Sequence, residues 1–132
     1  MRFSIALANG CFDLFHYGHY LHLKAASRLA DKLIVSVTLD ECVNKGPGRP
    51  VFTHHQRADI LRELRCVDGV ILCKNALDAL EHVNPDIFVK GSDYQRLEPE
   101  HEAYCKAHGI QIAFTNEPKF SSSRILDGLG RD

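Results

Sequence analysis

Two histidines with two residues between them, His16 and His19, lie in the stretch 9–19 near the amino end of the chain. A short apolar run at 3–8 precedes this stretch and predicts a buried strand, and the apolar spacing at 20–30 predicts a helix. The three-residue spacing lets both imidazoles lie on one face of the first helical turn. Because a helix start presents free backbone N–H groups and the positive end of a dipole, this turn is suited to bind a polyphosphate.

The other residues of the turn are expected to supply backbone and shape. Gly10 permits a tight turn, and Gly18 lets a ligand approach the backbone closely. We expect Asn9, Cys11 and Phe12 to contribute mainly backbone N–H groups and shape. Phe12 suits the hydrophobic core as well as it suits the wall of a ligand site.

Metal binding is a second chemistry that this region suggests. The Asp13 carboxylate could bind Mg²⁺, directly or through water, or it could fix the turn by accepting N–H bonds. A protein that binds metal through histidines is a rival hypothesis, based on the row His16, His19 and His22 and on the pair His54 and His55. No cysteine or carboxylate spacing completes such a site, and His22 is expected at the helix surface.

The elements that must position these residues follow from hydrophobic periodicity. Strands are predicted at 3–8, 32–38, 70–73, 87–89 and 110–114. Helices are predicted at 20–30, 53–64, 75–83 and 98–108, with a last one that starts in 121–123. The second helix has Thr53 as its N-cap and Gln56 as its capping-box partner. Alternating strands and helices predict an α/β fold, a single Rossmann-like domain over 1–132 with a doubly wound, five-stranded parallel sheet and helices on both faces.

Four unusual segments each follow a predicted strand. They are 9–19, 45–49, 90–94 and 118–124. In open parallel sheets the ligand binds beyond the carboxyl ends of the strands, so these segments are expected to meet at one rim.

Composition excludes several classes of function. The chain has 132 residues, 45% of them hydrophobic, and a formal net charge of −1, which favours neither nucleic acid nor an anionic membrane as a partner. Its five cysteines form no Cys-x-x-Cys pair, so neither a zinc site nor a disulfide framework is predicted. No signal peptide and no run of about 18 apolar residues is present, and we expect a cytoplasmic protein.

The pattern Gly-x-Phe-Asp-x-x-His-x-Gly-His at 10–19 resembles the signature of the cytidylyltransferase-like nucleotidylyltransferases. The glycerol-3-phosphate cytidylyltransferases and the adenylyltransferase domain of the ADP-heptose synthases are the most similar branches. The resemblance covers nearly the whole chain. It implies a nucleotidyltransferase that uses ATP or CTP with Mg²⁺, transfers AMP or CMP to a small phosphorylated metabolite and releases pyrophosphate. A homodimer is also implied by the resemblance alone.

The loop 45–51 looks like the corresponding loop of the heptose branch. That resemblance assigns Lys45 to the nucleotide phosphates, and it places Arg57 at a basic position that suits a polyphosphate. With His16 and His19, these residues form the expected catalytic group. Arg49 is a weaker candidate for the phosphate of the acceptor.

Two later segments complete the expected site. The sequence 89–94 matches the heptose-branch pattern Val-Lys-Gly-x-Asp-Tyr. It implies nucleotide contacts by Lys90, Gly91, Asp93 and Tyr94, with the acceptor as another role for Lys90. The hydroxyls of Ser121, Ser122 and Ser123 resemble the phosphate-binding triplet at the start of the family's last helix.

One departure separates the two branches. Asn116 stands where the glycerol-phosphate enzymes have an arginine, and Lys119 or Arg124 could supply the missing charge. The departure favours the heptose-like branch. A glycerol-3-phosphate-type cytidylyltransferase and a nucleotide-binding regulatory module without catalysis stay as alternatives. The sequence leaves the base and the acceptor open.

Overall fold

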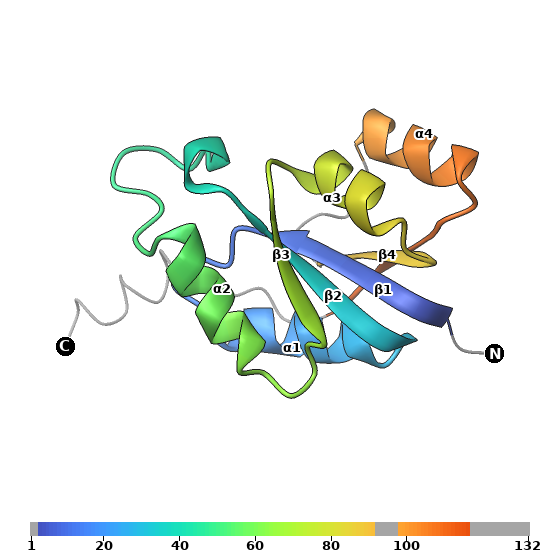
Figure 1. The fold of residues 1–132 in the computed structure, drawn as a ribbon, viewed down its shortest axis with the longest axis horizontal. Helices are drawn as coiled ribbons and strands as arrows, with labels where there is room; N and C mark the ends of the chain where they lie inside the picture. Colours follow the sequence, from blue (N-terminus) through green and yellow to red (C-terminus); the bar gives the residue numbers. More distant parts are fainter. Residues whose placement is uncertain (1–2, 92–97, 117–132) are drawn as a thin grey trace.

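The computed structural model describes residues 3–91 and 98–116, and their centre is one sheet of five parallel strands (Figure 1). The strands are β1 (Phe3–Gly10), β2 (Ala30–Thr38), β3 (Gly69–Cys73), β4 (Ile87–Lys90) and β5 (Gln111–Phe114). Their order is β3-β2-β1-β4-β5. The switch in strand order therefore falls at β1, which leads into the two-histidine turn.

Within the described residues, two helices cover each face of the sheet (Figure 1). They are α1 (Tyr17–Ser27) and α2 (His54–Arg62) on one face, and α3 (Ala76–Val83) and α4 (Pro99–Ala107) on the other. A short 3₁₀ helix, η1 (Asp40–Cys42), follows β2. No helix among the described residues combines the length and the apolar character needed to cross a membrane.

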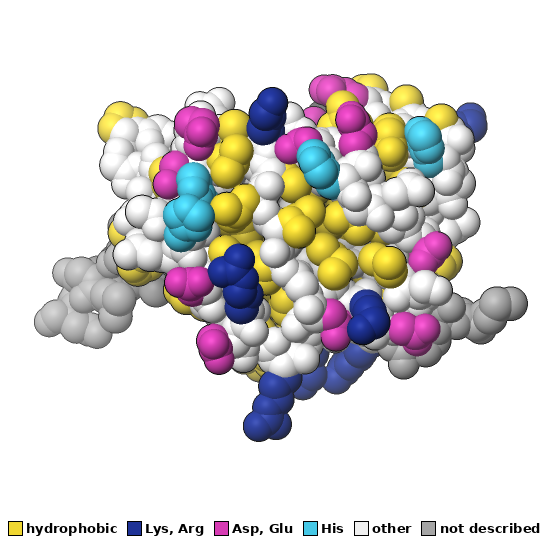
Figure 2. All heavy atoms as spheres, in the orientation of Figure 1, with side chains coloured by type: hydrophobic (Ala, Val, Ile, Leu, Met, Phe, Trp, Pro, Cys, Tyr) yellow, Lys and Arg dark blue, Asp and Glu magenta, His cyan; other side chains and the backbone are white. Residues whose placement is uncertain are grey.

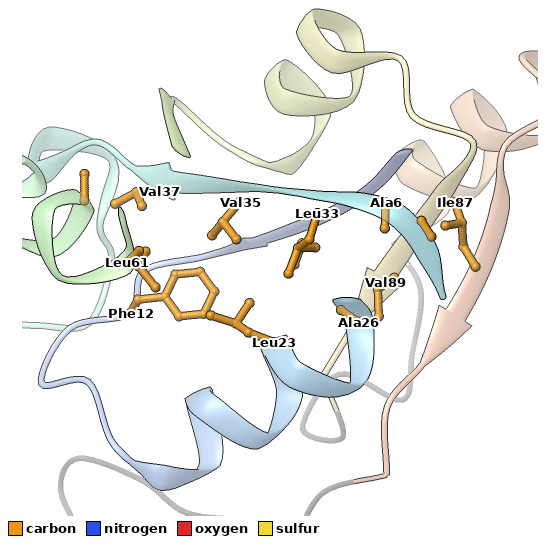
Figure 3. Close-up of a cluster of buried hydrophobic side chains, with 13 residues drawn as sticks. Ala6, Phe12, Leu23, Ala26, Leu33, Val35, Val37, Leu61, Ile87 and Val89 are labelled. Atoms are coloured by element: carbon orange, nitrogen blue, oxygen red, sulfur yellow. The ribbon is translucent and has the colours of Figure 1, made fainter. Parts of the chain in front are cut away.

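Alternation along β1 divides the core between the two faces. Ala6 and Ala8 pack with Leu23 of α1 and Leu61 of α2, whereas Leu7 packs on the side of α3 and α4. Figure 3 shows the first of these clusters, in which α1 and α2 approach the same stretch of the sheet. Through these two clusters the helices pack against the sheet, and this packing holds the turns that connect strands to helices.

The edge strand β3 lies on a surface of the molecule that is partly apolar. Residues 69–72 of β3 are partly exposed. Figure 2 shows apolar side chains gathered over the middle of this face, with charged side chains mostly around them.

The predicted fold class and parallel sheet are confirmed, and two helix boundaries are corrected. The first helix begins at Tyr17 rather than at 20, because His16 caps it, and it ends at Ser27. Residue 30, predicted as helical, begins β2. η1 was not predicted. The helix expected from 121–123 lies outside the described residues.

Candidate active site

The two histidines of the turn form a reciprocal cap at the start of α1. His16 is the N-cap residue, and its Nδ1 accepts a hydrogen bond from the Gly18 N–H at 3.1 Å. His19 Nδ1 accepts in turn from the His16 N–H at 3.3 Å. The two rings stack with centroids 3.8 Å apart. The motif thus satisfies two backbone donors with imidazoles in the way that a capping box does with a hydroxyl and a carboxylate.

This cap also determines where the imidazole protons lie. Because Nδ1 is the acceptor in both rings, a neutral ring carries its proton on Nε2 and can donate it. Burial, followed by the positive charges of His16, Lys45 and His22, lowers the pKa of His19 to about 3. His19 is therefore neutral at neutral pH, and it offers a bound phosphate a hydrogen bond rather than a charge.

Phe12 explains why a glycine is needed at position 10. The Phe12 ring is buried in the core cluster and meets the His19 ring edge-on, with centroids 5.4 Å apart. A Cβ on Gly10 would lie 2.9 Å from a ring carbon of Phe12. Phe12 is thus a core residue, and Gly10 is required by the packing of that ring. The positive φ in this turn belongs to Phe12 and Leu14, at 54° and 50°.

Asp13 fixes a loop, the second of the two roles predicted for it. Its carboxylate accepts from the backbone N–H of Val51 at 2.7 Å, from that of Phe52 at 3.0 Å and from Arg49 Nε at 2.8 Å. Although burial opposes its ionisation, these donors hold the pKa of Asp13 below its usual value. Because the side chain is fully buried and already has three donors, it does not fit the role of a magnesium ligand.

Arg57 is buried and makes contacts within the protein, and its expected role as a phosphate ligand stays a prediction. Its side chain is inaccessible to solvent and donates to the carbonyl oxygens of Cys11 and Phe52 at 2.7 and 3.0 Å. It also donates to Asp40 Oδ1 at 2.6 Å. Arg57 thereby joins the two-histidine turn, η1 and the start of α2, and these contacts give it a positioning role.

Lys45 and Arg49 lie on the loop that these contacts hold. Lys45 is exposed, and it is near enough to His19 for its charge to lower the pKa of that ring. Arg49 contacts Asp13 through Nε and is mostly buried. Lys45 thus lies near the histidine pair, and its contact with the nucleotide phosphates stays a prediction, whereas Arg49 takes part in holding the loop.

His22 connects α1 to the other half of the sheet, which the sequence did not suggest. Instead of lying at the surface it is buried, and its Nδ1 is 2.8 Å from Thr115 Oγ1. The Thr115 N–H donates to the Lys90 carbonyl oxygen at 2.9 Å. The one sequence signal for this contact is that Thr115, a polar residue, follows β5 directly.

Lys90 is the last residue of β4, and its expected contact with the nucleotide stays a prediction. Its amine lies 5.5 Å from the centre of the Phe88 ring, and Phe88 belongs to the core cluster under α3 and α4. Burial lowers the pKa of Lys90. Gly91 is half-buried at the end of this strand. Asp93, Tyr94, Lys119, Ser121, Ser122, Ser123 and Arg124 lie outside the described residues.

The remaining residues of the turn support its backbone. Asn9 accepts from the buried Ser36 hydroxyl at 2.6 Å, and Cys11 offers its carbonyl oxygen to Arg57. Of the histidines in the rival metal hypothesis, His54 Nδ1 accepts from the Asp40 N–H at 3.0 Å, and the row 16–22 makes the contacts above. No metal cluster of these histidines occurs among the described residues.

A Rossmann-like sheet whose switch point carries a helix start capped by two histidines has the architecture of a nucleotidyltransferase. The sequence matches the cytidylyltransferase-like family over residues 7–127. The chain belongs to this family of enzymes, as the ten-residue motif predicted.

Similar proteins agree with this assignment. The "Bifunctional protein HldE" of Helicobacter hepaticus is 41% identical over 132 residues, which are 97% of this chain and 27% of that protein. The protein of the same name from Methylobacillus flagellatus is 38% identical over 130 residues, 95% of this chain and 27% of its own length. The chain therefore spans about a quarter of the length of these relatives.

Two solved structures have a fold similar to that of this chain. A lipopolysaccharide core biosynthesis protein from Thermoplasma volcanium superposes with a TM-score of 0.77 at 29% identity, covering 89% of this chain and 99% of that one. Pantothenate synthetase from Thermus thermophilus superposes with a TM-score of 0.67 at 15% identity, over 96% of this chain and 62% of that chain. The second likeness concerns the fold alone.

Proposed function

We propose that this nucleotidyltransferase transfers AMP or CMP from ATP or CTP to a small phosphorylated acceptor, a sugar phosphate resembling heptose 1-phosphate, and releases pyrophosphate. The proposal is supported by relatives named HldE that match nearly the whole chain and by the similar structure described as a lipopolysaccharide core biosynthesis protein. The resemblance of the loops 45–51 and 89–94 to the adenylyltransferase domain of the ADP-heptose synthases favours ATP.

The reciprocal cap of His16 and His19 is the observation that carries the proposal. It places two imidazoles with protonated Nε2 atoms at a helix start, where backbone dipoles also favour phosphate oxygens. Charge that develops on a triphosphate during transfer is stabilised by donors that are already oriented. Lys45 adds a positive charge near His19.

The reaction needs no nucleophile or general base from the protein. A phosphate monoester is largely ionised at neutral pH, since its second pKa is about 6. One of its oxygens attacks the α-phosphorus of the nucleotide, the new P–O bond forms, and the bond to pyrophosphate breaks with its electron pair on the leaving group. Positioning and charge stabilisation are therefore the work of the protein, as in other phosphoryl transfers.

A substrate matrix tests the proposal. The full chain is incubated with each of ATP, CTP, GTP and UTP, combined with heptose 1-phosphate, other sugar 1-phosphates or glycerol 3-phosphate, and pyrophosphate is measured. We expect release with ATP or CTP and a sugar 1-phosphate. Absence of release with every sugar phosphate would contradict the proposal. Repeating the productive reaction with a chelator tests the expectation that the triphosphate is used with Mg²⁺.

The same matrix separates the alternative acceptor. A glycerol-3-phosphate-type cytidylyltransferase would release pyrophosphate only with CTP and glycerol 3-phosphate. Asn116, exposed after β5, opposes that alternative because the glycerol-phosphate enzymes carry an arginine there. Nucleotide binding without turnover in any combination would favour the regulatory module instead.

A further inference from the structure

Three side chains with metal-binding atoms converge at the carboxyl end of β3. Cys73 is the last residue of β3, and Asp78 and His82 lie one helical turn apart on α3. One ligand atom from each residue lies within 4.8 Å of those of the other two. Cys73 belongs to the core cluster under α3 and α4, whereas Phe12, which contacts His19, belongs to the cluster under α1 and α2.

The distances are close to those of a coordinated cation. Zinc–ligand bonds of about 2.0–2.3 Å place neighbouring ligands of a tetrahedral site about 3.3–3.8 Å apart. Asp78 Oδ1 and His82 Nδ1 are already 3.1 Å apart. Drawing the widest permitted separation, 4.8 Å, into this range needs a movement of about 1 Å. His82 is free to contribute to such a movement through its side-chain torsions, since 68% of this side chain is accessible.

We propose that Cys73, Asp78 and His82 form a binding site for a borderline-soft divalent cation of the Zn²⁺ type, with water as the fourth ligand. The combination of sulfur, imidazole nitrogen and carboxylate oxygen selects this class of cation, because Mg²⁺ and Ca²⁺ prefer oxygen ligands alone. Cys73 is 2% exposed, so the cation would enter from the side of His82.

The two carboxylate oxygens of Asp78 have separate roles. Oδ2 accepts the Lys74 N–H at 2.9 Å and holds the carboxylate in place. Oδ1 faces His82, whose Nδ1 also lies 2.8 Å from the Asp78 carbonyl oxygen. The cation would take the place of the proton between the imidazole and Oδ1. An outer hydrogen bond that orients a ligating carboxylate is a usual feature of metal sites.

Binding must also displace the thiol proton. Zinc binds the thiolate form of cysteine, so the buried Cys73 thiol has to lose its proton when the bond forms. A Zn²⁺–thiolate bond therefore forms with release of that proton to solvent. Proton release gives the experiment a second readout that adventitious binding to exposed carboxylates would not produce.

The site would join the edge strand to the helix that follows it. The Cys73 carbonyl oxygen accepts the Leu39 N–H at 3.0 Å, and the next residue, Asp40, is held by Arg57. The cation would thus stabilise the end of β3 against α3. The proposal does not depend on the substrates of the enzyme.

Metal titration of the full chain without a histidine tag tests the site. Co²⁺ binding is followed by the charge-transfer absorption of a cobalt–thiolate bond, and Zn²⁺ binding by calorimetry with a count of released protons. We expect one equivalent of either metal, the thiolate band, and proton release. The His82→Gln variant should bind at least about tenfold more weakly, because even the loss of an outer-shell partner costs about 10–100-fold.

Matched variants separate the site from other thiols and imidazoles. Cys105→Ser removes an equally buried thiol, and His108→Gln removes an exposed histidine at the end of α4. Both should retain wild-type affinity, whereas Cys73→Ser should lose the thiolate band. Absence of the band in the wild-type protein, or equal affinities in His82→Gln and His108→Gln, would overturn the proposal. The exposed His82 keeps the test valid even where Cys73→Ser does not fold.

Discussion

At the scale of single residues, the two histidines combine a structural task with a chemical one. His16 Nδ1 caps α1 through the Gly18 N–H, and His19 Nδ1 accepts the His16 N–H. In the proposed reaction, the Nε2 atoms then act as hydrogen-bond donors to the phosphate groups. A substitution that keeps the cap but removes the Nε2 donor can separate the two tasks.

His16→Asn and His16→Ala provide this separation. Asparagine is a good N-cap, whereas alanine at this position costs about 1 kcal/mol. We expect both variants to lower kcat by about 10²–10³, the loss typical of removing one oriented donor. Only the alanine variant should also lose stability in urea denaturation. Near-normal turnover of His16→Asn would show that capping alone explains this histidine.

The lowered pKa of His19 makes the stability of the protein depend on pH. Its pKa falls from 6.5 to about 3 on folding, mainly through burial. Between these values the unfolded chain binds a proton that the folded protein does not, so stability is complete above the unfolded pKa and is lost as the pH falls towards 3. The loss is at most about 1.4 kcal/mol per pH unit, and partial exposure of the ring reduces it.

His19→Gln isolates this contribution. Glutamine at this position of a capping box accepts the same backbone N–H but does not titrate. We expect the free energy of unfolding, measured by urea denaturation, to fall more in the wild type than in the variant when the pH is lowered from about 7.5 to about 5. Parallel pH curves for the two proteins would contradict the lowered pKa of His19.

At the scale of elements, the loop between β2 and α2 is held by two buried anchors. Asp13 binds its end at residues 51–52, and Arg57 joins Asp40, Phe52 and Cys11. Neither anchor needs to touch the nucleotide to matter. They set where the loop carries Lys45 relative to the histidines.

Arg57→Lys tests this positioning role. Lysine keeps the charge but lacks the planar fork that reaches three oxygen acceptors at once. Because lysine keeps the charge but leaves buried carbonyl acceptors of Arg57 without a donor, we expect a stability loss of about 1–3 kcal/mol and a raised KM for nucleotide. Arg62→Lys, on the exposed side of α2 with Asp59, is the control. Wild-type stability and KM in Arg57→Lys would indicate that only its charge is used.

The sequence predicts elements better than it predicts such anchors. Buried parallel strands are apolar runs, and Thr53 with Gln56 forms the predicted capping box, so local pattern suffices for them. The partners of Arg57 are up to 46 residues away, and no local pattern distinguishes a buried arginine from a phosphate ligand. The reason for Gly10 likewise depends on where the Phe12 ring lies in three dimensions.

At the scale of the whole molecule, parallel topology brings together residues that are distant in sequence. The turn after β1 and the ends of β4 and β5 lie at the same edge of the sheet. That topology alone predicts that segments following these strands lie near one another. The contact that joins the two sides, His22 to Thr115 across 93 positions, was not predictable from it, because each residue alone looks like an ordinary surface polar residue.

Thr115→Val removes this contact with little change of shape. In the arrangement in which Thr115 Oγ1 donates to the Lys90 carbonyl oxygen, His22 Nδ1 carries its proton and donates to Thr115. Valine deprives the buried imidazole of that acceptor, at a cost of about 1–3 kcal/mol. Since His22 is one turn from His19 on α1, we also expect a kcat reduced several-fold.

Thr115→Ser keeps the hydroxyl and is the matched control for this prediction. Urea denaturation and steady-state kinetics of the three proteins should place the serine variant near wild type and the valine variant below both. Equal stability of the two variants would mean that α1 is held by its apolar face alone, through Leu23 and Ala26. A stability loss without a change in kcat would mean that the contact between His22 and Thr115 stabilises the fold only. The cap formed by His16 and His19 would then keep its position without this contact.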